Sequence, residues 1–462
     1  MKKNIRASAL KSRLPAALAA VCTISAGALS GVALEACDPG AFDSLRDAAG
    51  VLVADAPDGY ARGGYGTVLA SFNGTLGGVQ VSRLTASADA DSQLRVYAAW
   101  TGTALQMDPA AYDVCKDPGD CETGAGASLS GVSAWRGEAL CVVTGAPNAN
   151  LILVRCEESP TNAIERVTGP TGSLFGASVA GLPSGSVLVG APGGGSGSGT
   201  IFLANATTGV SELVLTGARA SGVSRIGAHM AVAPTATGGV IAAITATGGT
   251  VKRVIVVELD AAGTSTLLGC VDDANPGFGA VVAVGNLVGG DNVPDVVVGD
   301  DASQPARREA VRIYDGAALR AAGGACPAAV TPTIVTCADV RGVACMGSAY
   351  GAALAIGDVD GDGDGDLAIG APEANFQGTN NAGAVWLVPG NGSTLETTGA
   401  DLLAASDPVT SARLGTSVAM VETRRRSEVA AGAPGAAEVY LFACSGLTGD
   451  GVTAGPRCIP SM

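Results

Sequence analysis

Five aspartates occupy alternate positions in the stretch GDVDGDGDGDLAIGAP, residues 357–372. They are Asp358, Asp360, Asp362, Asp364 and Asp366. In a loop that wraps a cation, spacing by two turns alternate side chains inward, so the carboxylates meet at one point. Gly363 allows the sharp turn that such a loop requires. Oxygen-only, multiply anionic ligation favours Ca²⁺ over Zn²⁺, so we expect one calcium ion here.

Two other interpretations of this stretch have to be weighed. An EF-hand needs a bidentate glutamate at position 12 of its loop. Counted from Asp358 as position 1, position 12 is Ile369, inside the apolar run LAIG. The pattern therefore predicts a strand–loop–strand site. The other interpretation is a solvated acidic turn, in which five carboxylates without a cation would repel one another.

A second loop, GNLVGGDNVPDVVVG at 285–299, has the same character. Asn286, Asp291 and Asp295 could align as ligands, but the loop carries one extra residue and Asn292 replaces the glycine. A weak metal site and a site that has lost ligation are both compatible with this sequence.

The strands that must position these loops recur along the chain. The order FGASV, then LVGAP, then GTIFL occupies 175–203, and related triplets occupy 278–314, 350–388 and 414–443. Degenerate copies at 51–72, 126–156 and 225–259 make seven. A repeat of this length suits a four-stranded unit, and seven units arranged radially bury their faces against one another. We expect an all-β, seven-bladed propeller. The gap 57–147 could hold a long insertion or an eighth blade.

This ordered triplet, Phe/Tyr-Gly, an Asp-rich loop and Gly-Ala-Pro, resembles the FG-GAP repeat of integrin α-subunit propellers and related bacterial secreted proteins. The copies at 174–203 and 350–388 match it closely. The resemblance implies that Asp364 ligates the metal through its backbone carbonyl. It also implies a binding or adhesion module that engages a protein or glycan at the cell surface. The alternative is a propeller hydrolase or the non-catalytic domain of one.

The N-terminus indicates export. A basic start containing Lys2 and Arg6 precedes an apolar stretch, so residues 1–36 are expected to be a signal peptide and 37–462 the propeller. A transmembrane anchor is the alternative, but no stop-transfer pattern follows. No later stretch of about 18 apolar residues is free of charged or turn residues. Cys37 ends LEAC, a sequence similar to a lipoprotein processing site, although Glu35 departs from the usual small residue. The net charge of −15 argues against nucleic-acid binding.

Twelve cysteines without a CxxC motif are typical of disulfides in an exported protein. Four close pairs are disulfide candidates: Cys115 with Cys121, Cys141 with Cys156, Cys337 with Cys345, and Cys444 with Cys458. Cys141 and Cys156 flank the turn PNAN symmetrically, so we expect them to face each other across a hairpin. The pairing of Cys270 and Cys326 is left open.

The residues for catalysis are sparse. The chain has one histidine, His229, and no G-x-S-x-G elbow. A pair of acids for glycoside hydrolysis is not visible in a linear sequence, because it depends on separation in space. We therefore expect a binding protein rather than an enzyme.

Overall fold

The computed structural model describes the chain over most of its length after residue 50. The described residues are 5–6, 51–55, 64–76, 79–88, 93–100, 105–108, 113–115, 125–138, 140–157, 164–213, 215, 222–300, 309–340, 347–424 and 426–443. The expected signal segment (apart from Ile5 and Arg6) and Cys37 lie outside them.

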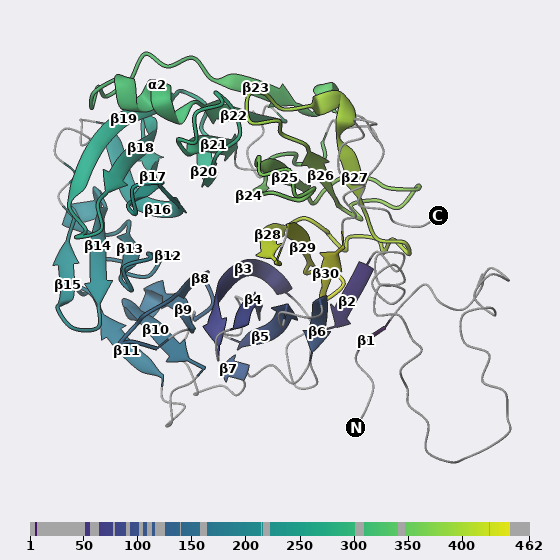
Figure 1. Cartoon of the computed structure of the whole chain (residues 1–462), viewed down its shortest axis with the longest axis horizontal. Coiled ribbons are helices and arrows are strands. Elements are labelled where there is room, and N and C mark those ends of the chain that lie inside the picture. Colours follow the sequence, from purple (N-terminus) through teal and green to yellow (C-terminus); the bar gives the residue numbers. More distant parts are fainter. Residues whose placement is uncertain are drawn as a thin grey trace, which may run out of the picture.

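The strands of these residues form seven antiparallel sheets arranged around a central opening (Figure 1). Blade 1 contains β3 (Tyr65–Leu76), β4 (Val79–Ala88), β5 (Gln93–Trp100), β6 (Leu105–Asp108) and β7 (Asp113–Cys115). Blade 2 contains β8 (Ser128–Val132), β9 (Cys141–Ala146), β10 (Leu151–Cys156) and β11 (Glu165–Thr168). Blade 3 contains β12 (Ser178–Gly181), β13 (Val187–Ala191), β14 (Thr200–Asn205) and β15 (Gly209–Glu212). The expectation of a seven-bladed, all-β propeller is confirmed.

The remaining blades follow the same order. Blade 4 contains β16 (Val223–Pro234), β17 (Val240–Gly249), β18 (Lys252–Leu259) and β19 (Ser265–Asp273). Blade 5 contains β20 (Phe278–Gly285), β21 (Asp295–Asp300), β22 (Ala310–Tyr314) and β23 (Thr333–Thr336). Blade 6 contains β24 (Ala353–Gly357), β25 (Asp366–Ala371), β26 (Ala384–Val388) and β27 (Asp401–Leu403). Within the described residues, one α-helix forms, α2 (Gly316–Ala321), after β22.

Blade 7 joins the two ends of the described chain. Its inner strands are β28 (Ser417–Glu422), β29 (Ser427–Ala433) and β30 (Glu438–Phe442). The fourth strand is β2 (Val51–Asp55), which pairs antiparallel with β30 and carries the two-residue β1 (Ile5–Arg6) on its other edge. Pairing of an early strand with the last blade closes the ring and protects its edges.

This closure corrects the expected first repeat at 51–72. Val51–Asp55 belongs to blade 7, whereas the segment that follows, beginning at Tyr65, is the innermost strand of blade 1. The gap 57–147 therefore holds blade 1 itself and the start of blade 2, not an insertion or an eighth blade. The error arose because the apolar run 51–55 has the same local pattern wherever it pairs, and its partner lies almost 400 residues away.

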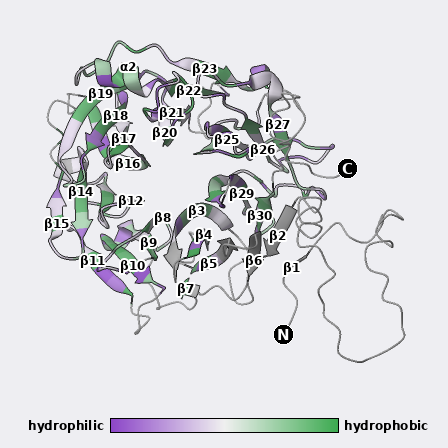
Figure 2. Ribbon diagram, in the orientation of Figure 1, coloured by the Kyte–Doolittle hydropathy of each residue, from purple (hydrophilic) through white to green (hydrophobic). Residues whose placement is uncertain are grey.

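Apolar packing between neighbouring blades forms the core. Seven buried clusters occur among the described residues, each shared by two successive blades, including one between blades 7 and 1. The second strand of a blade lies between such clusters, and every residue of β9, β13, β21, β25 and β29 is buried. Figure 2 shows the hydrophobic residues concentrated in the strands. Burial on both faces explains why these strands are continuous runs of Val, Leu, Ile and Ala.

The Phe-Gly and Gly-Ala-Pro sequences meet where one blade contacts the next. The carbonyl oxygen of Gly227, at the start of blade 4, would lie 2.1 Å from a Cβ atom added to Gly190 in blade 3. Gly227 itself has a φ of +89°, and Ser178 Oγ donates a hydrogen bond of 2.9 Å to its oxygen. The same approach recurs between Gly145 and Gly176, Gly299 and Gly351, Gly370 and Gly415, and Gly432 and Gly66. The repeated glycines are therefore required by the close approach of neighbouring backbones.

Two disulfides join described residues. Cys141 and Cys156 are directly opposite in the β9–β10 register and are bonded, which confirms that prediction. A second bond joins Cys270 of β19 to Cys326 after α2, and this pairing settles what the sequence left open.

The three other predicted cysteine pairs are not tested by the described residues. Cys121, the expected partner of Cys115, lies outside them. Cys345, the expected partner of Cys337, also lies outside them, although Cys337 itself is disulfide-bonded. Both members of the last pair, Cys444 and Cys458, fall after the last described residue. These three pairings therefore stay predictions.

Candidate metal centre

The aspartate loop connects the first and second strands of blade 6. Strands β24 and β25 pair in a register that places Gly357 opposite Asp366. The loop therefore begins and ends at neighbouring positions. This pairing explains why Asp358 and Asp366, eight positions apart in sequence, come close together.

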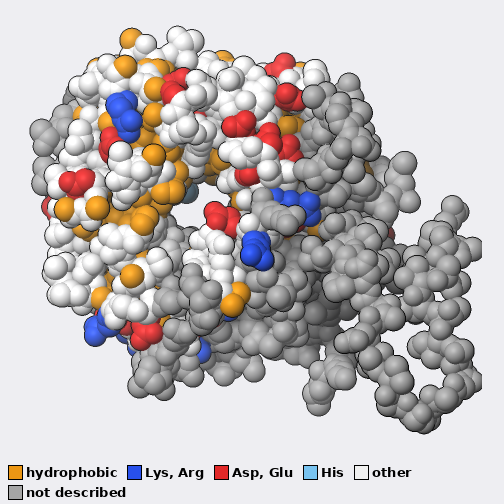
Figure 3. Space-filling view, viewed as in Figure 1, with side chains coloured by type: hydrophobic (Ala, Val, Ile, Leu, Met, Phe, Trp, Pro, Cys, Tyr) orange, Lys and Arg blue, Asp and Glu red, His pale blue; other side chains and the backbone are white. Residues whose placement is uncertain are grey.

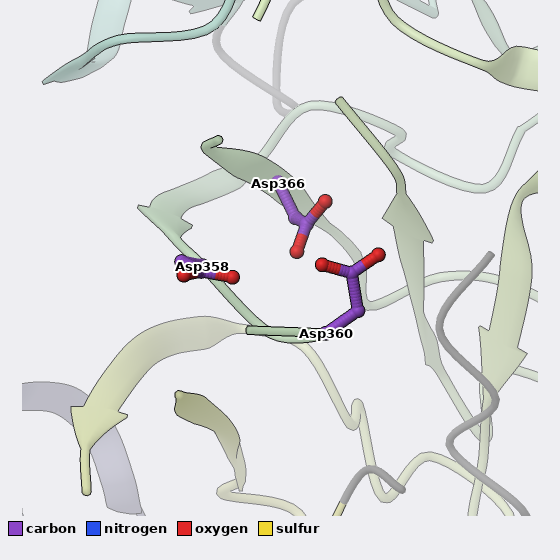
Figure 4. Close-up of side chains that lie close together, drawn as sticks. All are labelled: Asp358, Asp360 and Asp366. Carbon is purple, nitrogen blue, oxygen red and sulfur yellow. The ribbon is translucent and has the colours of Figure 1, made fainter. Parts of the chain in front are cut away.

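Three of the five aspartates converge. Asp358, Asp360 and Asp366 each offer a carboxylate oxygen, and these atoms all lie within 4.8 Å of one another. Figure 4 shows the carboxylates of Asp360 and Asp366 directed toward each other, with Asp358 beside them. Among the described residues, this is the one group of three or more acidic, histidine or cysteine side chains so close together.

Backbone N–H groups hold the loop in its curved form. Asp358 accepts hydrogen bonds from the N–H of Gly361 at 2.7 Å and of Gly363 at 3.0 Å. Asp360 accepts from the N–H of Asp362 at 3.1 Å. All three contacts are local, and the one between Asp360 and the N–H two residues ahead is an Asx turn. The chain thus arranges these carboxylates through its own short-range hydrogen bonds.

Asp366 connects the loop to the body of the blade. Its side chain is fully buried, and its two oxygens accept from the N–H of Val359 at 2.6 Å and of Gly390 at 2.9 Å. Burial raises the pKa of Asp366 to about 7, although both hydrogen bonds act in the opposite direction. The ionised form of this carboxylate is therefore costly without a cation.

Burial also disfavours the ionised forms of the neighbouring carboxylates. Burial, and next the negative charge of Asp362, raise the pKa of Asp360 to about 6. Burial also raises the pKa of Asp358. A cation would favour the ionised form of all three groups, and an all-oxygen donor set suits a hard divalent ion.

The other two predicted ligands lie differently. Asp362 is exposed at the tip of the loop, and its carboxylate accepts from the N–H of Asp364 at 2.8 Å. Asp364 is half-buried, with its carboxylate beside Gly392. Neither side chain belongs to the converging group. Figure 3 shows that acidic side chains gather over blade 6 on the face turned toward the viewer, beside the central opening.

The second loop also contains a buried aspartate. Asp295 is fully buried and accepts from the N–H groups of Leu287, Val288 and Gly316, each at 2.8 Å. Burial raises its pKa to about 6. Asp291 is exposed, and its carboxylate accepts from the N–H of Val293 at 2.9 Å. The weak metal site at Asn286, Asp291 and Asp295 stays a prediction.

The sequence interpretation missed a structural role of the aspartate at the end of each loop. Asp366 and Asp295 each begin a fully buried strand. Each accepts from backbone N–H groups of its own loop and of the segment after the third strand. The signal was present in the sequence, since both aspartates stand four residues before the glycine of the blade contact. This aspartate organises the loop whether or not a metal ligand set accompanies it.

Comparisons with known proteins identify the repeat. The family model of the FG-GAP repeat matches residues 350–388, which contain the aspartate loop. No curated protein matches the chain. Among solved structures, the chain is similar to a functionally unknown protein from Desulfotomaculum acetoxidans DSM 771, with 12% identity and a TM-score of 0.38. That match covers 70% of this chain and 86% of the other. The chain is thus a seven-bladed propeller that carries an FG-GAP repeat in blade 6.

Proposed function

We propose that this protein is an exported, calcium-binding propeller that acts as a binding module at the cell surface. The observation that carries the proposal is the convergence of Asp358, Asp360 and Asp366 in one strand–loop–strand segment. Three carboxylates so close together, two of them with raised pKa values near neutrality, are suited to a divalent cation.

These three carboxylates would hold the calcium ion, with the Asp362 side chain and the Asp364 carbonyl as the further ligands that the sequence pattern implies. The ion would act structurally. It would offset the repulsion among the carboxylates and stabilise the end of blade 6 on the face where the first and second strands of each blade connect.

Export is supported by the covalent structure. The Cys141–Cys156 and Cys270–Cys326 bonds require an oxidising compartment to persist. Residues 1–36 would direct the chain there as a signal peptide, and 37–462 would be the mature propeller. Acylation of Cys37 would attach it to a membrane surface. None of the described helices is long and apolar enough to cross a membrane.

The binding role follows from the kind of surface a propeller offers. The loops at each end of the blades form two rims, and a binding site can draw residues from more than one blade. His229 is exposed on β16, and its backbone N–H donates to Thr245 Oγ1 at 3.1 Å. No specific contact among the described residues favours the hydrolase alternative.

Calorimetric titration of the purified, chelator-treated protein with Ca²⁺ tests the proposal directly. We expect one site at blade 6, and Asp358→Asn should abolish its heat of binding. Incubation with a surface extract of the producing organism, with and without calcium, should then recover a protein or glycan partner. Absence of calcium binding would refute the metal assignment. Hydrolysis of a surface polymer that His229→Ala abolishes without unfolding would instead support the enzyme.

A further inference from the structure

A pocket lies between blades 4 and 5, on the rim opposite the aspartate loop. The aspartate loop connects the end of a first strand to the start of a second. This pocket instead lies near the start of the first strand, β16, and the end of the second, β17. It has a volume of about 440 Å³. The lining residues include Arg225 and His229 of β16, Thr247 of β17, Lys252 of β18 and the segment 276–280.

The charge of this pocket is opposite to that of the protein as a whole. Of the described residues that line it, Arg225, His229 and Lys252 are basic and none is acidic, although the chain has 42 acidic and 27 Lys and Arg residues. The described carboxylates nearby have other partners. Asp272 pairs with Arg253 at 2.7 Å and Asp300 with Arg312 at 2.8 Å. Asp273, which lies opposite Lys252 in the β18–β19 register, contacts Arg312 at 3.5 Å. Among the described residues, neither Arg225 nor Lys252 forms an ion pair with these carboxylates.

The fold positions the basic groups. Arg225 has a φ of +58°, a left-handed conformation in the residue that stands two positions before the blade-contact glycine, and its side chain is exposed. Lys252 Nζ donates to the carbonyl oxygens of Thr247 at 2.6 Å and Gly249 at 3.3 Å. An ammonium group has three N–H donors, so one is left for a ligand. The backbone conformation thus places Arg225 at the pocket, and two hydrogen bonds hold the ammonium group of Lys252.

We propose that this pocket binds a small oxyanion group, a carboxylate or a phosphate carried by the partner of the propeller. An arginine guanidinium binds either oxyanion through two parallel hydrogen bonds, and the lysine adds a point charge. The Thr247 hydroxyl supplies a further donor. This inference rests on the proposed binding function and names the chemistry that the module recognises.

Three matched sugars test the proposal by calorimetric titration of the purified, calcium-loaded protein. Glucuronate carries a carboxylate, glucose 6-phosphate carries a phosphate, and glucose is neutral. We expect one or both anionic sugars to bind while glucose does not, and their relative affinities identify the oxyanion. Arg225→Gln should weaken binding by about tenfold to a hundredfold, the usual range for a charge-assisted hydrogen bond.

Arg413→Gln is the matched control, since Arg413 occupies the same repeat position in blade 7, is exposed, has a φ of +58° and lies outside the pocket. Lys252→Gln is a second test that decides the matter if Arg225→Gln does not fold. The proposal is wrong if neither anion binds, if glucose binds equally well, or if Arg413→Gln weakens binding as much as Arg225→Gln. Calcium titration of chelator-treated portions of the same preparations separates this outcome from failure of the metal assignment.

Discussion

The calcium dependence of stability should disappear when Asp360 is changed to Asn. Asp360 contributes one of the three carboxylate oxygens that lie within 4.8 Å of one another. Two unit charges at that separation repel by about 3 to 4 kcal/mol at an effective dielectric constant of about 20. Removing one of three charges therefore relieves repulsion in the metal-free protein and also removes a ligand from the metal-bound protein.

Burial adds a second energetic term. The pKa of Asp366 rises from 3.8 to about 7, so keeping this carboxylate ionised costs the metal-free fold about 4 kcal/mol above that pH. Calcium at a hundredfold its dissociation constant stabilises the folded state by about 2.7 kcal/mol. For a chain of this size, that free energy corresponds to a rise in Tm of about 3 to 5 °C.

Differential scanning calorimetry at pH 8, with calcium or with chelator, measures this effect. We expect the wild-type Tm to fall in chelator and the Asp360→Asn Tm to be the same in both buffers. Asp364→Asn, in the same loop but outside the converging group, should keep the wild-type response. Magnesium should give a smaller rise, because it demands stricter octahedral geometry. Equal calcium responses in the wild type and Asp360→Asn would refute the reasoning, as would a wild type that ignores chelator.

In chelator, the free energy of unfolding should fall as the pH rises from 5.5 to 8, because the folded-state pKa of Asp366 is raised and its protonated form favours the fold. Calcium should flatten this profile. Thermal melts at a series of pH values, with and without calcium, measure both effects. Cys156→Ser should lower the free energy of unfolding by about 3 kcal/mol, because it opens the 15-residue loop closed by the bond to Cys141. Denaturant titration measures this change, and an unchanged midpoint would contradict the bond. Gly190→Ala should destabilise the fold by several kcal/mol, since its Cβ would overlap a backbone oxygen of the next blade, whereas Gly399→Ala, with no atom closer than 3.8 Å, should be tolerated in the same titration.

The candidate metal site was predictable from sequence in its location but not in its composition. Alternation of aspartates and glycines indicates a tight acidic loop, because Asx turns and glycine conformations are local properties. Which carboxylates converge depends on the β24–β25 register and on Gly390, which comes 24 residues after Asp366. The exposed position of Asp362 could not be inferred from the spacing alone.

The basic pocket between blades 4 and 5 had no signal in the sequence. Arg225, His229 and Lys252 are spread over 28 positions and follow no motif. They line one cavity because β16 and β18 lie in one sheet and the start of β20 packs beside them. Such a site depends on which strands are neighbours, and a linear pattern does not record neighbours in space.

The repeating unit of this protein could be defined from local sequence. Buried strands appear as continuous apolar runs, and the blade contact appears as recurring glycines, because each reflects the immediate environment of a few residues. The folded chain was needed to show that the run 51–55 completes the last blade and that Cys270 bonds to Cys326. Both are pairings between distant segments whose local sequences would suit other partners equally well, and closure of the ring selects among them.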